Sequence, residues 1–413
     1  MAAPAGEQLG LYISIPFCRS KCTYCNFGSG VYPAAEHGRY IQCLIEEIRA
    51  SRRWSENLGV ELPSRVDTIY LGGGTPSLLE PDLIAQLFAA IRAEFNTEAD
   101  AEVTVECAPG QIADATLAAF TQAGVNRISL GVQSFIDREA HQSGRLHSRA
   151  IVLNDLERLR SAGITNLNLD LIAGLADQTF ASWQESVSVL LDTSVAHASI
   201  YMLEVDDDSR LGRELMAGGV RYHAEFVPTD DTMARMYETA IESLAAAGLP
   251  QYEISNFARP GFESRHNLRY WERRPYLGLG LDASSMLRAT RRSDESEQPG
   301  YVLRSTTNDD LKAYLDTSQP PETAWLSPDR QHEEAWFLGL RLNGGVSISA
   351  LRQEFGNPMV AHALDTVEKL VERSLLTFDG ETVRLTPQGR LLSNDVFQEF
   401  LEIANPPVSL TAR

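Results

Sequence analysis

Short apolar runs alternate with helical patterns through the first half of the chain, and this alternation restricts the fold more than any other feature. Strand followed by helix predicts a parallel sheet. Six such units in about 200 residues favour an α/β fold with an incomplete (β/α)6 barrel, and a flat doubly wound sheet is the alternative. The predicted strands are Leu11–Ile15, Val66–Leu71, Ala101–Cys107, Arg127–Val132, Asn166–Ile172 and His197–Leu203.

The segments between these strands carry helix signals. Residues 39–50 place five apolar side chains on one face, as expected of a helix that covers a sheet: Tyr40, Ile41, Leu44, Ile45 and Ile48. Pro81 suits a first helical turn, and Ser148 suits an N-cap. Three glycines follow helical patterns where a C-terminal cap is expected, namely Gly124, Gly163 and Gly248.

Polar residues gather where the predicted strands end. Three cysteines follow the first strand and "GGGTP" (residues 72–76) follows the second, while Glu106, Gln133 and Asp170 close the third, fourth and fifth. The carboxyl ends of barrel strands meet at one rim, which is where barrel enzymes hold their active sites. A carboxylate inside an apolar sheet is costly without a partner, so the positions of Glu106 and Asp170 indicate a site.

The second half has a different character. Residues 251–271 look irregular and aromatic, residues 288–300 look like an exposed polar loop, and residues 317–328 form a Pro-rich link. From about residue 325, three helical patterns and a hairpin turning at Asp379–Gly380 resemble a winged helix. We therefore expect a barrel domain at 1–249, a connector at 250–320 and a small winged-helix-like accessory domain at 321–413.

Composition narrows the class of protein. In 413 residues, 43% hydrophobic and 22% charged content is that of a globular protein, and no apolar run is long enough for a transmembrane segment. The net charge of −20 argues against a nucleic-acid partner, and residues 321–413 hold 8 basic and 13 acidic residues, a net of −5. The N-terminus shows no signal sequence, so we expect a cytoplasmic protein without disulfides.

The cysteines are the strongest chemical signal. Cys18, Cys22 and Cys25 lie in a C-x3-C-x2-C spacing, whereas Cys43 and Cys107 fit packed positions in a helix and a strand. Structural zinc usually takes four ligands in two separated pairs, and ferredoxin clusters take four cysteines. Three thiolates suit a cubane with one open iron. The glycine stretch lacks the Lys and Ser/Thr of a phosphate-binding loop, which leaves a tight turn or close backbone contact with a ligand.

This cysteine spacing resembles the radical S-adenosylmethionine (radical SAM) superfamily, in which the open iron of a 4Fe–4S cluster binds the amino and carboxylate groups of S-adenosylmethionine. Further blocks resemble its oxygen-independent coproporphyrinogen III oxidase-like family, and most closely the haem chaperone branch, HemW. The resemblance spans residues 11–271 and rests on "LYISIPFCRSKCTYCNF", "IYLGGGTPSLL", "NRISLGVQSF", "GRLH", "NLDLIAGL" and "HNLRYW".

The resemblance implies a set of cofactor-binding residues. By motif position they are Tyr12, Tyr24, Gly73, Gly74, Thr75, Glu106, Gln133, Arg145 and Asp170. Each also has a plainer interpretation, since the tyrosines could simply pack and Arg145 could be a surface charge. Glu106, Gln133 and Asp170 are the stronger candidates because they share the rim.

Two features separate the branches of the family. True coproporphyrinogen dehydrogenases carry a further cysteine two positions after the last cluster ligand, where this chain has Phe27. The motif "HNLRYW" matches the HNxxYW motif linked to haem in the chaperone branch. This implies that His266 ligates haem iron while Tyr270 and Trp271 pack against the macrocycle.

The chain also departs from the family pattern. Ser14 replaces the usual histidine of "YIHIPFC", "ECAPG" replaces "EANPG", and "GLGLDASSM" (residues 278–286) differs from the family's "GxGAGAHS"-like run.

The resemblance implies a protein that binds haem and delivers it to an acceptor protein, with an electron donor for its cluster. Two alternatives stay open. One is a radical SAM enzyme, a dehydrogenase or methyl-transfer relative, acting on a tetrapyrrole or another substrate. The other is a structural zinc protein with a vestigial barrel.

Overall fold

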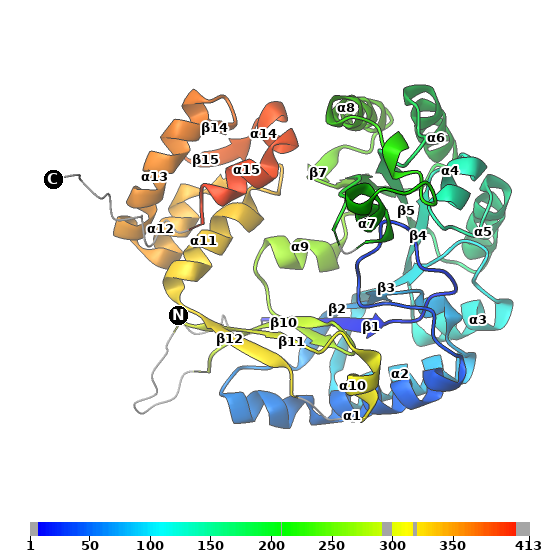
Figure 1. The fold of residues 1–413 in the computed structure, drawn as a ribbon. Helices are drawn as coiled ribbons and strands as arrows, with labels where there is room; N and C mark the ends of the chain where they lie inside the picture. The colour runs from blue at the N-terminus through cyan, green and yellow to red at the C-terminus, as the bar shows by residue number, and fades with distance from the viewer. Residues whose placement is uncertain (1–6, 208, 291–299, 317–319, 402–413) are drawn as a thin grey trace.

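The computed structural model describes residues 7–207, 209–290, 300–316 and 320–401 (Figure 1). Six parallel strands lie side by side in their order along the chain. A doubly wound sheet reverses its strand order and this one does not, so the predicted incomplete barrel is confirmed. The strands are β1 (Leu9–Ile15), β2 (Arg65–Gly73), β3 (Asn96–Cys107), β4 (Arg127–Gln133), β5 (Asn166–Ala173) and β6 (His197–Met202).

Six helices run along the outside of this curved sheet (Figure 1). They are α1 (Ala35–Leu58), α2 (Pro81–Glu94), α3 (Asp114–Ala123), α4 (Asp137–Gln142), α5 (Arg149–Ser161) and α6 (Phe180–Asp192). The predicted apolar face of α1 is buried, and Pro81 opens α2. Gly124 takes the left-handed conformation, with φ 84°, and its N–H bonds Phe120 O. Ser148 occupies the N-cap of α5 without a side-chain cap bond.

The segment expected to be irregular is partly regular, and that expectation was wrong. A hairpin of β7 and β8 extends the sheet beyond β6, and β9 to β12 extend it beyond β1. These strands are too short to show a period in sequence and form by pairing with the barrel. The elements are α7 (Arg210–Ala217), α8 (Asp230–Ala246), β7 (Gln251–Glu253), β8 (Asn256–Ala258), α9 (Arg265–Trp271), β9 (Tyr276–Leu279), β10 (Ser284–Arg288), β11 (Val302–Thr306), α10 (Leu311–Asp316) and β12 (Glu322–Leu326).

Two of the predicted linkers include residues outside the ranges that the structure describes. Residues 291–299 of the polar stretch and 317–319 of the Pro-rich link lie outside the described residues. The rest of the link is not a linker, because Glu322–Leu326 pairs with β11 as an edge strand. Pro320 and Pro321 precede this strand, a position where the missing N–H breaks no ladder.

The C-terminal unit has the predicted winged-helix-like form and its own apolar core around Trp336. Gly380, with φ 94°, turns the hairpin, and the Asp379 carboxylate accepts the N–H groups of Glu381 and Thr382. The domain boundaries at 249/250 and 320/321 stay predictions. The elements are α11 (Pro328–Gly339), β13 (Val346–Ser347), α12 (Ile348–Phe355), α13 (Asn357–Glu372), β14 (Leu376–Phe378), β15 (Thr382–Leu385), α14 (Pro387–Leu391) and α15 (Ser393–Gln398).

The two sides of the barrel strands differ in chemistry. On β3, Val103 and Val105 belong to the apolar core, whereas Glu102 and Glu106 alternate with them and make polar contacts. Alternation along a strand sends such residues to opposite faces. No helix within the described ranges has the length and apolar content needed to span a bilayer.

Candidate functional site: a cysteine-lined cavity at the barrel rim

The three clustered cysteines lie in the loop between β1 and α1. All three line one cavity of about 750 Å³. Backbone bonds fix the loop: the N–H of Cys18 donates to Gly30 O at 2.8 Å, and the N–H of Thr23 donates to Ser143 O at 3.1 Å. Of the other two cysteines, Cys43 lies in α1, and Cys107 is a buried residue at the edge of the cavity.

The surroundings of these thiols fit an iron–sulfur cluster. Arg145 Nη1 donates to Cys22 Sγ at 3.4 Å, and the Thr75 hydroxyl lies 3.8 Å from Cys18 Sγ. Burial raises the pKa of the Cys18 thiol, so a thiolate there needs the positive charge of a metal. Across the described chain, no three His, Cys, Asp or Glu side chains are grouped to hold one metal ion. A cubane differs from a single ion because each thiolate binds a different iron.

The glycine turn after β2 is fitted against the start of the cysteine loop. The N–H of Gly74 donates to Ile15 O at 2.9 Å, and the N–H of Thr75 donates to Phe17 O at 2.7 Å. A Cβ on Gly74 would lie 2.7 Å from Ile15 O, and Gly73 has φ 93°. Both observations require glycine. Gly73, Gly74 and Thr75 line the same cavity as the cysteines.

Two partly buried carboxyl groups line the same cavity. Glu106 accepts the Tyr70 hydroxyl at 2.8 Å, and Asp170 accepts Asn168 Nδ2 at 2.7 Å. Burial, with Asp170 nearby, raises the pKa of Glu106 to about 7, although the Tyr70 bond opposes the rise. Burial also raises the pKa of Asp170. A cationic or hydroxyl-bearing ligand between these groups would stabilise their ionised forms.

Unpartnered polar atoms also indicate a ligand in this cavity. Gln133 Oε1 and Arg145 Nε are buried without a hydrogen-bond partner. Gln133 has φ 68°, a conformation that glutamine rarely adopts outside functional sites. Together with Tyr24, these residues complete the predicted cofactor set in the main cavity, with one exception.

The exception is Tyr12, which lines a neighbouring cavity of about 240 Å³. Gly73 and Phe27 border both cavities, and Phe27 is 65% exposed. Ser14 and Asp282, two positions where the chain departs from the family pattern, also line the smaller cavity.

His266 lies in neither cavity. It belongs to helix α9 rather than to a loop and is 1% exposed. Its Nδ1 lies 2.9 Å from Thr68 Oγ1 and its Nε2 lies 2.8 Å from the Tyr270 hydroxyl. Burial, with Arg269 and Arg127 nearby, lowers the pKa of His266 to about 3, so the ring is neutral. Both ring nitrogens are therefore occupied inside the barrel.

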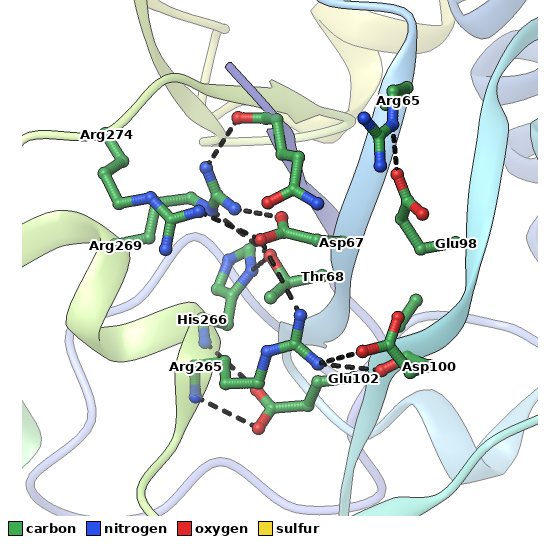
Figure 2. A network of polar contacts seen from close by, with 12 residues as sticks. Arg65, Asp67, Thr68, Glu98, Asp100, Glu102, Arg265, His266, Arg269 and Arg274 are labelled. Carbon is green, nitrogen blue, oxygen red and sulfur yellow. Dashed lines mark hydrogen bonds and ion pairs between the residues drawn. The ribbon is translucent and has the colours of Figure 1, made fainter. Parts of the chain in front are cut away.

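Figure 2 shows how α9 is anchored there. The backbone N–H groups of Arg265 and His266 both donate to the Glu102 carboxylate of β3 at 3.0 Å. Asp67 of β2 meets three guanidinium groups: Arg269 directly, Arg274 at 3.0 Å and Arg265 at 3.8 Å. Arg269 is fully buried and also donates to Gln8 O and Pro275 O.

Helix α9 contacts β2 and β3, the strands that also carry residues of the cofactor cavity. Thr68 and Glu102, which hold α9, lie four residues before Gly72 and Glu106 on the same two strands. The His266 ring stacks on Tyr70 with centroids 5.2 Å apart, and Tyr70 bonds Glu106. His266 thus contacts the cofactor cavity through one tyrosine.

Several cavity residues escaped the sequence-based prediction. Tyr201 of β6, Tyr237 of α8 and Ile254 line it from the barrel side, and Arg341 and the start of α15 line it from the C-terminal unit. Strand alternation could have found Tyr201, since it lies two residues after Ser199 on the polar face. No local pattern marks Arg341, because the chain fold alone brings it to the barrel.

Comparisons with known proteins agree with this geometry. The family model of the radical SAM superfamily matches residues 12–190, and that of the HemN C-terminal domain matches residues 326–392. The solved structure of coproporphyrinogen III oxidase (HemN) from Escherichia coli has a TM-score of 0.79 at 22% identity, over 97% of this chain and 91% of that one. This is a likeness of fold.

Curated relatives match nearly the whole chain. Heme chaperone HemW of Lactococcus lactis is 33% identical over 94% of this chain and 96% of its own length. HemW of Bacillus subtilis is 33% identical over 94% and 98%, and the mouse mitochondrial radical S-adenosyl methionine domain-containing protein 1 is 32% identical over 93% and 85%. Superfamily membership implies S-adenosylmethionine and a 4Fe–4S cluster as cofactors. The chain belongs to the HemW family of the radical SAM superfamily.

Proposed function

We propose that this protein binds haem and delivers it to acceptor proteins, with a 4Fe–4S cluster on Cys18, Cys22 and Cys25 and S-adenosylmethionine beside it. The observation that carries the proposal is the match over nearly the full length to proteins named heme chaperone HemW. Phe27 supports this branch, because the dehydrogenase branch has cysteine at that position.

The cofactor assignment rests on the contents of the main cavity. Gly73, Gly74 and Thr75 would hold the methionine end of S-adenosylmethionine next to the cluster, and Glu106 and Asp170 would accept its donors. When bound, the cluster would supply an electron to the sulfonium group. The residues of the chain orient the ligand, exclude water and carry the charge that the ligand matches.

Haem ligation by His266 would require a change of conformation. The ring would have to leave its bonds to Thr68 and Tyr270, and α9 would have to leave the barrel. In the conformation described here, we assign His266 to holding α9 in place. In that conformation neither ring nitrogen of His266 is free to bind a haem iron.

The test is an anaerobic haem titration of the reconstituted protein, followed by transfer to an apo-haemoprotein. The expected result is a saturable Soret shift at one haem per chain and loss of that band when the acceptor is added. Absence of saturable binding would refute the proposal. The cytoplasm keeps thiols reduced, as cysteines that hold a cluster must be, so a cytoplasmic site of action and an electron donor belong to the same proposal.

A radical enzyme of the coproporphyrinogen III oxidase-like type is the second candidate. It is favoured by the gathering of all the predicted cofactor residues except Tyr12 in one cavity, which a carrier protein need not have. Anaerobic incubation with a reductant and coproporphyrinogen distinguishes the two. Substrate-dependent 5′-deoxyadenosine with a modified porphyrin supports the enzyme, and unchanged porphyrin supports the chaperone.

A further inference from the structure

The lining of the main cavity includes, besides the cofactor residues, side chains of both the barrel and the C-terminal unit. Its walls combine apolar and polar groups. Tyr237 and Ile254 contribute the barrel side, and Leu391 and Leu392 contribute the other side. Backbone bonds join the two sides, since the N–H of Ile254 donates to Arg341 O at 3.2 Å.

Arg341 is the basic side chain that the described part of the C-terminal unit contributes to the cavity wall. Its guanidinium lies over the Trp271 ring, 4.2 Å from the centroid. A stacked guanidinium is held in one orientation, so little conformational freedom is left to lose on binding. Trp271 is the last residue of "HNLRYW", so that motif contacts the cavity wall through Arg341.

The hydrogen-bonding capacity of Arg341 is not filled within the protein. Its Nε is buried without a partner. Its ion pair with Glu253 is long, at 3.6 Å from Nη2 to Oε2, and that oxygen also lacks a hydrogen bond. A guanidinium has five N–H donors in a planar fork that matches a carboxylate. One acidic side chain, Asp395, lies on the same wall.

We propose that Arg341 anchors a carboxylate of the tetrapyrrole, with the apolar walls covering part of the macrocycle. The inference rests on the proposed haem-binding function and names the group of the ligand that is recognised. Haem has the required chemistry, namely a flat apolar body with propionate groups on one edge.

The experiment compares two ligands and three variants. Wild type, R341Q, D395N and the control R373Q are titrated anaerobically with haem and with haem dimethyl ester, in one detergent buffer. Arg373 is an exposed basic residue of the C-terminal unit, paired with Glu399 away from the cavity. Cluster absorbance and S-adenosylmethionine affinity establish that each variant is folded.

We expect R341Q to weaken haem binding by at least about 10-fold, as the loss of a charge-assisted bond implies, and to leave ester binding unchanged. R373Q and D395N should bind haem at least as tightly as wild type. Equal effects of R341Q on both ligands, or an equal loss in D395N, would overturn the inference. Failure of wild type to bind either ligand would instead refute the proposed function.

Discussion

Replacing His266 by alanine tests whether α9 supports the cofactor cavity through Tyr70 and Glu106. The change leaves the Thr68 and Tyr270 hydroxyl groups without their imidazole partner and removes a ring stacked on Tyr70. The Thr68 hydroxyl keeps its bond from Arg269 Nε at 3.3 Å, so only the Tyr270 hydroxyl is left unpaired, at a cost of about 1–2 kcal/mol, and the lost ring packing costs a similar amount. We therefore expect H266A to lose about 2–4 kcal/mol of the free energy of unfolding of the barrel.

The assay is urea unfolding of the reconstituted protein, followed by circular dichroism and by the cluster absorbance. H266Q is the matched variant, because its amide can both donate and accept and should recover about half of the loss. His362 is exposed, so H362A should behave as wild type. S-adenosylmethionine affinity should fall with stability in H266A, since Tyr70 connects His266 to Glu106.

The pH dependence of the free energy of unfolding provides an independent test of the role of His266. The folded state holds the pKa of His266 near 3, so the unfolded chain takes up a proton that the folded chain does not. This part of the stability is present above the unfolded pKa of about 6.5 and is lost as the pH falls toward 3. Glutamine does not titrate, so H266Q should remove this pH-dependent contribution to the free energy of unfolding. Wild-type stability in H266A, or an unchanged pH profile in H266Q, would refute the structural role.

Three further predictions concern the site and its anchor. C22A should abolish the cluster absorbance on reconstitution, whereas C43A should keep it; loss in both would indicate a different ligand set. S-adenosylmethionine affinity should rise from pH 6 to 8 because the pKa of Glu106 is about 7 and the carboxylate is the binding form, and E106Q should flatten this rise. Protonation of S-adenosylmethionine itself affects its binding to wild type and to E106Q equally. Parallel pH profiles of the affinity in these two proteins would therefore contradict the role assigned to Glu106. R269M removes the direct partner of the buried Asp67 carboxylate and should lower the free energy of unfolding in urea by about 3–5 kcal/mol. R373Q, at an exposed ion pair, should lower it by less than about 1 kcal/mol.

The barrel was predictable because its signals are local. Apolar runs and the capping residues of α2 and α3 are visible in a window of a few residues, and polar residues at strand ends meet wherever parallel strands form a barrel. Long-range packing decided the rest. The position of His266 in the fold depends on Glu102 and Asp67, which lie 164 and 199 positions earlier in the chain. The motif around His266 therefore indicates a haem ligand, whereas its contacts in the structure make it a buried residue that holds α9. Arg341 reaches the cavity only because the C-terminal unit pairs with β7 and with Ile254, the residue that follows it.

Electron paramagnetic resonance of the reduced, reconstituted protein, with and without S-adenosylmethionine, tests the central claim most directly. If three cysteines hold a cubane with one open iron, iron and sulfide should be present in equal amounts, and the ligand should shift the signal of the reduced cluster. One zinc without labile sulfide, or a cluster signal that the ligand leaves unchanged, would contradict the account.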